Sequence, residues 1–187
     1  SRIAAVTLEL GGKSPQIVFP DVDINHTVDG VISAMRFARQ GQSCTAGSRL
    51  FVNESIAKEF VEALVNKLKS MKVGDPLDDA TDAGSVVNAK QYQRVCSYIK
   101  EAMELDPSAL LLGVSTWKSE EDVIERANSS EYGLAAFVWS RAGAPAIRVA
   151  HALHVGWVLI NQGTGQQIGH SYGGVKQSGA GREFSLE

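Results

Sequence analysis

Short, apolar, β-branched stretches alternate with longer amphipathic stretches over most of this 187-residue chain. In the longer stretches apolar residues recur at steps of three and four, which is typical of helices that bury one face. Parallel strands need such helical crossovers to connect them. The alternation therefore predicts an α/β fold, with a layered, mostly parallel sheet flanked by helices.

The individual elements follow from this periodicity and from its end signals. Asp23 and Ser119 are in positions typical of helix N-caps, and Gly41 is a stop signal for the first helix. The predicted strands cover residues 3–10, 16–19, 49–52, 110–117, 133–140 and 156–161, and the predicted helices cover residues 23–41, 56–71, 85–103, 119–128 and 144–153. The glycine-rich tail from Gln162 to Glu187 shows no periodicity.

Charge and cysteine usage exclude several classes of partner. The net charge of −3 offers no basic surface for nucleic acid or for an anionic membrane. No apolar stretch approaches the length of about 20 residues that spans a bilayer, and the first residues lack a signal-peptide pattern. The two cysteines show no metal-ligand spacing. We therefore expect a cytoplasmic protein with free thiols, no metal site, no membrane and no nucleic acid.

Cys44 lies between two glycine-punctuated turns, in the stretch ARQGQSCTAGSRLFV, and not inside an apolar run. Such a thiol is displayed at a loop, as a nucleophile must be, although a displayed thiol can also be incidental. Cys96, by contrast, lies beside the apolar stripe of the predicted helix 85–103. We interpret Cys96 as a structural residue.

Glu9 ends an apolar stretch in ELGGKSP and precedes Gly11 and Gly12. Partial burial would raise the pKa of Glu9 toward the range of a general base, whereas a salt bridge to Lys13 is an equally good interpretation. Two glycine-rich stretches follow later in the chain. GTGQQIG has the wrong spacing for a dinucleotide fingerprint and is predicted to be a pocket-lining loop. YGGVKQSGAGRE has a glycine density that indicates backbone held close to another group.

The order of five motifs is more specific than any one of them. ELGGKSP, GQSC with AGSRLFV, KVGDPLD, ANSSEYGLAAFVWS and YGGVKQSGAGRE follow one another along the chain. In this order they resemble the aldehyde dehydrogenase superfamily, over about residues 5–100 and 116–187 and in its C-terminal, catalytic half. The resemblance implies that residues 1–10 end the cofactor-binding domain. It also implies that residues 11–187 form the catalytic domain, shortened around 104–116, where the family's EEIFGPV motif has no counterpart.

The resemblance also implies a reaction and its residues. Members of the family oxidise an aldehyde to a carboxylic acid with NAD or NADP, through a cysteine thiohemiacetal and a thioester. Cys44 corresponds to the nucleophile and Glu9 to the carboxylate that activates water. Leu10, Gly11 and Gly12 correspond to residues beside the nicotinamide, while Asn161 and Gln162 border the substrate tunnel.

The same resemblance leaves three functions open for this chain. It implies a small-molecule aldehyde as substrate, a homo-oligomer and an incomplete cofactor site, since the dinucleotide-binding units precede Ser1 in the family. The first possibility is therefore a dehydrogenase fragment with impaired activity. The second is a cofactor-independent thiol esterase remnant, and the third is a non-catalytic partner or structural chain with unpaired strand edges.

Overall fold

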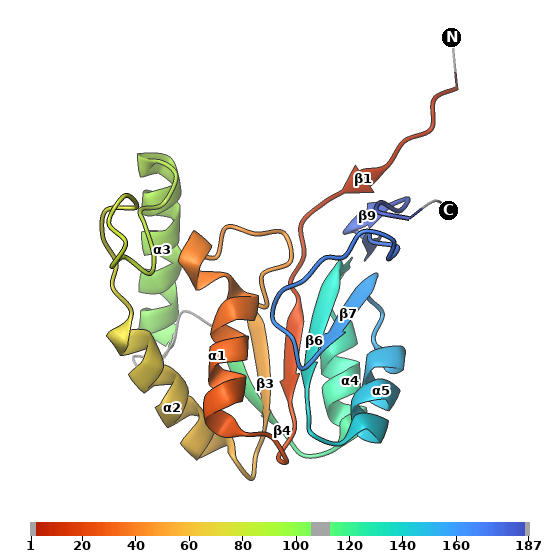
Figure 1. Cartoon of the computed structure of the whole chain (residues 1–187), viewed down its shortest axis with the longest axis horizontal. Coiled ribbons are helices and arrows are strands. Elements are labelled where there is room, and N and C mark those ends of the chain that lie inside the picture. The colour runs from red at the N-terminus through yellow and green to blue at the C-terminus, as the bar shows by residue number, and fades with distance from the viewer. Residues whose placement is uncertain (1–2, 106–112, 186–187) are drawn as a thin grey trace.

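Five parallel strands form the central sheet of the computed structural model, which describes residues 3–105 and 113–185 (Figure 1). In spatial order they are β4 (Gly113–Trp117), β3 (Arg49–Asn53), β2 (Pro15–Val18), β6 (Ala135–Trp139) and β7 (Trp157–Ile160). Every residue of β2 and β6 is buried, as expected for parallel strands covered on both faces. The predicted α/β fold class is confirmed.

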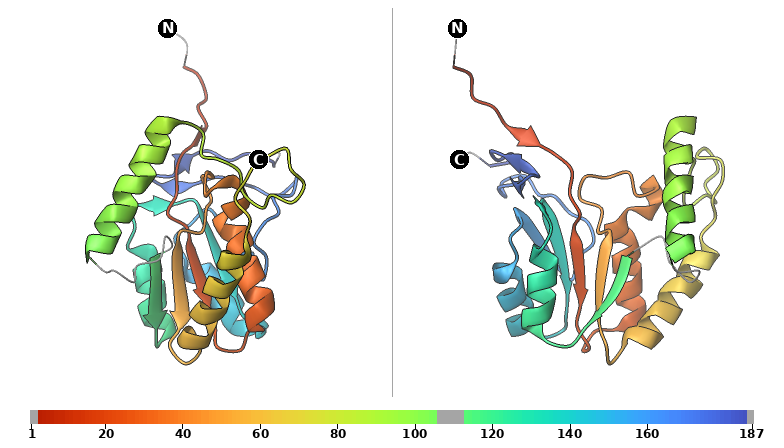
Figure 2. Two further views of the ribbon diagram at one scale, coloured as in Figure 1. Left: turned by 90° about the vertical axis from the view of Figure 1, so that its left-hand side faces the viewer. Right: turned by 180° about the vertical axis from the view of Figure 1, so that it is seen from behind.

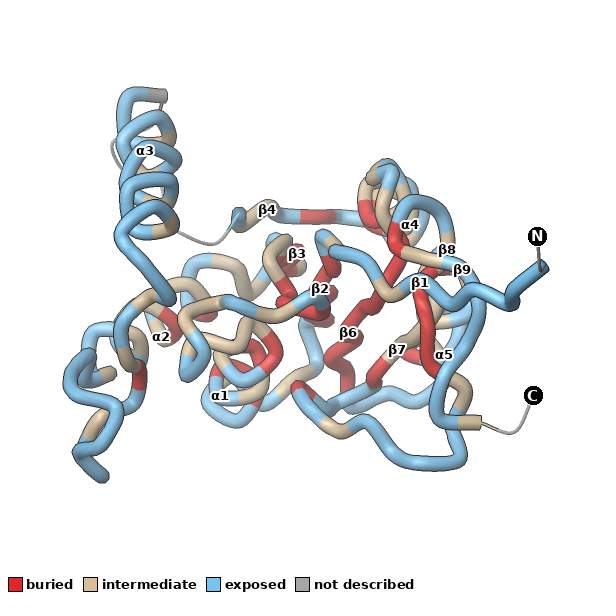
Figure 3. Tube along the Cα trace, turned by 90° about the horizontal axis from the view of Figure 1, so that it is seen from above, coloured by how far each residue is buried: buried red, intermediate tan, exposed pale blue. Residues whose placement is uncertain are grey.

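Helices cover both faces of the sheet (Figures 1 and 2). On one face α1 (Ile24–Met35) and α2 (Ala57–Ser70) pack against a core that includes Val18 and Trp139. On the other face α4 (Glu120–Asn128) and α5 (Gly143–Ala152) pack against a core that includes Ile17. Because side chains alternate along a strand, neighbouring residues of β2 serve the two cores. Buried residues accordingly follow the strands of the sheet in Figure 3.

Two predicted helix caps are confirmed. The Asp23 carboxylate accepts a hydrogen bond of 2.9 Å from the backbone amide of His26 at the start of α1. The Ser119 hydroxyl accepts one of 3.2 Å from the amide of Asp122 at the start of α4. Each side chain satisfies an amide that has no partner inside the helix.

The C-terminal part of the chain folds over the amino ends of the central strands. There β1 (Leu8–Glu9) pairs with β9 (Gly179–Ala180), and β5 (Tyr132–Gly133) pairs with β8 (Val175–Lys176), both antiparallel. Figure 1 shows β1 and β9 side by side near the N-terminus. Residues far apart in the sequence therefore meet at this end of the sheet.

Four predicted boundaries were wrong or lie beyond what is described. The stretch 3–10 forms a strand only at Leu8–Glu9, because residues 3–7 are exposed and pair with no strand. The first helix ends at Met35, since Arg36 takes the left-handed conformation with φ 62°, and a short 3-10 helix, η1 (Phe37–Arg39), follows. The predicted strand 110–117 is β4 from Gly113 onward, and residues 110–112 lie outside the described residues. The helix predicted over 85–103 is α3 (Ala89–Leu105).

Within the described ranges, no helix is both long and apolar enough to cross a membrane.

Candidate active site

The loop of Cys44 is held at the amino end of β3 by neighbours on both sides. The backbone amide of Gly47 donates to the carbonyl of Ala34 in α1, at 3.1 Å. The carbonyl of Gly47 accepts a hydrogen bond of 2.8 Å from the buried side chain of Gln16 in β2. With its base fixed in this way, the turn leaves Cys44 exposed and free of a disulfide. The prediction that this thiol is displayed is confirmed.

The backbone around Cys44 is open on one side and tightly packed on the other. Over residues 3–105 and 113–185 the amide of Cys44 donates to no acceptor. Its carbonyl oxygen lies against Gly12, where a Cβ atom would come within 3.0 Å of it and within 2.9 Å of Leu134 Cβ. Only glycine fits there, so Gly12 brings the β1–β2 connection directly against the cysteine loop.

Glu9 lies in β1 with its carboxylate partly buried. Its Oε1 atom is buried and has no hydrogen-bond partner among the described residues. Burial, together with the like charge of Glu183, raises the pKa of Glu9, while the Gly174 amide and Arg182 partly oppose this shift. No ion pair joins Glu9 to Lys13 in the described part of the chain, so the salt-bridge interpretation is wrong.

Tyr172 stands between these two groups. It is buried, and its hydroxyl lies beside both the Cys44 thiol and the Glu9 carboxylate, with the Gln166 amide also near. Burial and the two negative groups raise the pKa of Tyr172 far above its usual value. No hydrogen bond joins Glu9 to Cys44 in the described structure, so the two are related through their common neighbour Tyr172.

Arg36 adds a positive charge near Cys44 and Tyr172. Burial and the neighbouring Arg39 lower the pKa of Arg36, and the negative forms of Cys44 and Tyr172 oppose that shift. A cation near a cysteine favours its reactive thiolate form. Sequence reasoning missed Arg36, since no motif marks it. It is the left-handed residue that ends α1, eight positions before Cys44.

Ser178 fixes the strand that carries Glu9. Its hydroxyl donates to the carbonyl of Gly11 at 2.7 Å and accepts from the amide of Gly133 at 2.9 Å. Its carbonyl accepts a hydrogen bond of 2.9 Å from the amide of Leu10. Ser178 is fully buried, and sequence reasoning missed it, because nothing distinguishes this serine in its glycine-rich stretch.

The glycine density of that stretch has the predicted cause. A Cβ on Gly174 would lie 2.4 Å from the carbonyl oxygen of Ser178, and one on Gly173 would lie 3.1 Å from Glu9 Oε1. Gly179 has φ +149° and packs against the Leu8 carbonyl. The backbone therefore lies directly against the candidate site, where no side chain would fit.

Asn161 and Gln162 are not brought to Cys44. Asn161 follows the carboxyl end of β7, whereas Cys44 precedes the amino end of β3, and the two strands run parallel. The Asn161 side chain exchanges hydrogen bonds of 3.0 and 2.7 Å with the backbone of Ser140. Gln162 is exposed. From there the chain passes Gly163, which packs against α1, and continues to Tyr172, whose backbone pairs with Glu183.

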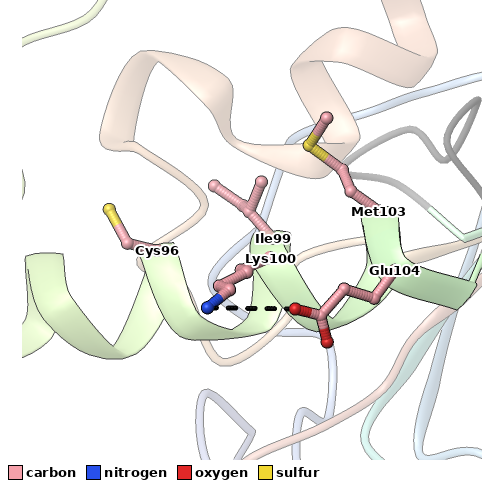
Figure 4. Close-up of a pocket in the computed structure, with 5 residues that line it drawn as sticks. All are labelled: Cys96, Ile99, Lys100, Met103 and Glu104. Atoms are coloured by element: carbon pink, nitrogen blue, oxygen red, sulfur yellow. Dashed lines mark ion pairs between the residues drawn. The ribbon is translucent and has the colours of Figure 1, made fainter.

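Two apolar hollows lie on or beside α3 and do not include Cys44. The smaller, of about 440 Å³, is lined along one helix face by Cys96, Ile99, Lys100, Met103 and Glu104 (Figure 4). The larger, of about 790 Å³, lies between α3 and α2 and includes Met35 and Leu68. Cys96 is exposed, so the expectation that it packs as a structural residue was wrong, because α3 buries no residue that the structure describes.

These residues can carry out nucleophilic acyl chemistry. They supply an exposed thiol beside a cation, a backbone amide free to bind an oxyanion, and a carboxylate with a raised pKa. Among the described residues no group of three or more histidine, cysteine or acidic side chains could hold a metal ion.

The family model of the aldehyde dehydrogenase family matches residues 1–113 and 110–187. The chain is 37% identical to hydroxyisobutyraldehyde dehydrogenase of Mycolicibacterium austroafricanum, over all of this chain and 44% of that protein. It is 36% identical to retinal dehydrogenase 2 of Mus musculus, over 98% of this chain and 42% of that protein.

Solved structures give the same picture. Betaine aldehyde dehydrogenase of Staphylococcus aureus in complex with NAD+ superposes with a TM-score of 0.89 at 32% identity, over 97% of this chain and 44% of that one. A Bacillus cereus aldehyde dehydrogenase, solved as a G224D mutant, superposes with the same score at 32% identity, over 96% of this chain and 44% of that one. The chain thus spans less than half the length of the proteins that it matches.

Proposed function

Because this chain belongs to the aldehyde dehydrogenase family, we propose that Cys44 is the nucleophile of an aldehyde-oxidising site and Glu9 its general base. The observation that carries the proposal is the grouping of the exposed Cys44 thiol and the partly buried Glu9 carboxylate around Tyr172. Glu9 lies in β1 and Cys44 in the loop before β3, and both lie at the amino ends of the central strands. A carboxylate with a raised pKa beside an exposed cysteine is typical of a functional site and is not expected by chance.

The residues of the chain divide the chemistry among themselves. The Cys44 sulfur attacks the aldehyde carbon, and the free amide of Cys44 binds the oxyanion of the resulting thiohemiacetal. At the later thioester, Glu9 takes a proton from water, the hydroxide attacks the carbonyl, and the carbon–sulfur bond breaks to release the acid and the thiol. This step needs one water between Glu9 and Cys44, which share no direct hydrogen bond in the described structure.

NAD or NADP fits this site only in part. Leu10, Gly11 and Gly12 would lie beside the nicotinamide, and a Cβ on Gly11 would meet nothing within 4 Å, so a flat ring can approach its backbone. The chemistry that the cofactor supplies when bound is acceptance of the hydride. The Staphylococcus aureus relative was solved with NAD+, but less than half of its length is matched here. We therefore infer that binding of the adenosine and phosphates needs residues outside this chain.

We also propose a domain assignment and a setting. Residues 1–10 would end the cofactor-binding domain and residues 11–187 would form the C-terminal catalytic half, shortened around 104–116. The meeting of the two family matches at residues 110–113 supports the shortening. A cytoplasmic location would keep the thiols of Cys44 and Cys96 reduced. The substrate would be a small-molecule aldehyde. Asn161 and Gln162 would influence its binding only indirectly, by positioning the loop that leads to Tyr172.

A specific observation favours thiol esterase activity as the second candidate. Cys44, its free amide and Glu9 all belong to this chain, and acyl transfer from an activated ester needs no cofactor. Attack by Cys44 expels p-nitrophenolate and forms the thioester, which Glu9-activated water then hydrolyses. A non-catalytic chain that assembles with copies of itself is the third candidate.

One pair of assays separates these functions. The purified chain is tested for NAD(P)+ reduction with a panel of aldehydes and for p-nitrophenyl acetate hydrolysis, beside Cys44→Ala and the matched control Cys96→Ala. We expect ester hydrolysis that falls at least about 100-fold in Cys44→Ala and is unchanged in Cys96→Ala. NAD(P)+ reduction lost in Cys44→Ala would show a working nicotinamide site. Activity in neither assay would contradict both catalytic proposals.

A further inference from the structure

The hydroxyl of Tyr172 is a buried polar group with no partner. The side chain is 5% exposed, and among the described residues no atom forms a hydrogen bond with the hydroxyl oxygen. Buried hydroxyls are nearly always paired, so a lone one needs an explanation. The neighbouring Oε1 atom of Glu9 is also buried and unpaired in the described structure.

The ring of Tyr172 packs against two aromatic rings, and its backbone is paired with Glu183. The Trp157 ring packs edge-on at 5.5 Å and the Phe184 ring lies at 5.8 Å. The backbone of Tyr172 exchanges hydrogen bonds of 2.9 and 2.7 Å with Glu183. This packing holds the hydroxyl near the Cys44 thiol, which is itself exposed and therefore open to a substrate.

The hydroxyl keeps its proton. The pKa of Tyr172 lies far above its usual range because of burial and the adjacent Cys44 and Glu9. A neutral thiol is a weak acceptor and a thiolate is a strong one. The hydroxyl is thus a donor that gains a good partner only when Cys44 ionises.

We propose that the hydroxyl of Tyr172 donates a hydrogen bond to the Cys44 sulfur in its thiolate form and thereby stabilises the nucleophile. This inference rests on the nucleophilic role proposed for Cys44, and it adds a residue from the far end of the chain to the reacting atom. The charged groups around the pair are Arg36 beside Cys44, Arg39 beside Arg36, and Glu9 beside Tyr172, with Glu183 and Arg182 next to Glu9. All of them are retained when only the hydroxyl is removed.

Alkylation by iodoacetamide tests this without aldehyde, ester or NAD(P)+. The sulfur forms a bond to carbon, the carbon–iodine bond breaks, iodide leaves, and the thiol proton goes to solvent. Because Cys96 is also exposed, Cys96→Ser is the background for every variant. We expect Tyr172→Phe to react about tenfold more slowly than the parent at neutral pH, and the difference between the two rates to disappear at strongly alkaline pH.

Phe184→Leu is the matched control, since it disturbs the same aromatic group and keeps the hydroxyl. Its pH profile should follow that of the parent. Superimposed profiles of Tyr172→Phe and parent, or equal slowing in Phe184→Leu, would overturn the proposal. Circular dichroism shows whether each variant folds.

A second measurement does not depend on the folding of Tyr172→Phe. In the parent, the near-ultraviolet absorption of one tyrosine should shift when Cys44 becomes a thiolate, and Cys44→Ala should remove the shift. A shift that persists in Cys44→Ala would contradict the hydrogen bond. Normal alkylation without any Cys44-dependent turnover would count against the proposed function and leave the tyrosine inference standing.

Discussion

Glu9 illustrates how the local environment changes the pKa of a candidate catalytic carboxylate. Burial is the largest cause of its raised pKa, and Glu183 adds to it. A carboxyl group whose pKa is raised on folding contributes stability at low pH and loses it as the pH rises through the folded-state pKa. A proton acceptor at this position is therefore maintained at some cost in stability near neutral pH, which is typical of functional sites.

The corresponding prediction concerns the second half of ester turnover. Glu9→Gln keeps the shape of the side chain and removes the base, so the acyl-enzyme on Cys44 should accumulate. We expect a burst of about one p-nitrophenolate per chain, followed by a steady rate about 100-fold lower than in the parent. In the parent, that steady rate should rise with pH through the titration of Glu9, and in Glu9→Gln this rise should be absent.

Lys13→Gln is the control for this experiment, because Lys13 is exposed and forms no ion pair with Glu9 in the described structure. It should leave both phases unchanged. An equal loss of the burst and of the steady rate in Glu9→Gln would instead mean that Glu9 supports the loop of Cys44 and does not act on water.

Local patterns and tertiary contacts account for different residues of the site. The display of Cys44 was predictable because glycines on both sides prevent a continuous apolar face. The roles of Arg36 and Tyr172 were not, because each depends on a contact across the fold that no local pattern encodes. For Asn161 the local pattern was misleading. Asn161 lies near a motif in the sequence, but its side chain bonds to the backbone of Ser140 and does not reach the site.

The same distinction between local patterns and tertiary contacts applies to helices and strands. The starts of α1 and α4 were predictable because an N-cap bonds to an amide three residues away. The stretch 3–10 was mispredicted because a strand requires a partner, and β9 offers only two residues to β1. The end of α1 at Met35 could not be predicted from the sequence, because Arg36, which ends the helix, is not a usual residue for the left-handed conformation.

The packing of α1 on β6 leads to a prediction about stability. Gly30 lies in the middle of α1, where a Cβ atom would come within 2.3 Å of the Trp139 ring. Trp139 is 2% exposed and has little room to move. Although alanine favours helix by up to about 1 kcal/mol, we expect the clash in Gly30→Ala to prevail and to lower the free energy of unfolding by about 1–3 kcal/mol. Urea unfolding followed by circular dichroism measures this change.

Gly143→Ala is the matched control, since Gly143 begins α5 and a Cβ there would meet nothing within 4 Å. It should leave stability unchanged or raise it by about 0.5 kcal/mol, because alanine restricts the unfolded chain. A similar small gain in Gly30→Ala would show that Trp139 can shift, and that α1 is less closely packed on the sheet than the structure indicates.

The whole molecule divides into a well-packed sheet with its covering helices and a poorly covered α3. The cores on the two faces of the sheet share strands β2, β3 and β6, so these elements should unfold together. The candidate site lies at the amino ends of these strands, so its proposed catalytic groups lie next to the well-packed core. By contrast, α3 has no buried residue among those described, and Tyr92, Tyr98 and Met103 are all at least half exposed.

This asymmetry predicts two classes of amide hydrogen exchange. Amides of β2, β3 and β6 should exchange only on global unfolding, whereas those of α3 should exchange much faster through local opening, because few buried contacts oppose it. Exchange measured by mass spectrometry on peptides from 89–105 and from the three strands tests this, with α2, which buries Phe60 and Leu64, as the comparison helix. Protection of α3 equal to that of α2 would mean that another surface covers its apolar face. A dilution series would then show whether that surface belongs to a second copy, because protection by a second copy would fall as the protein is diluted.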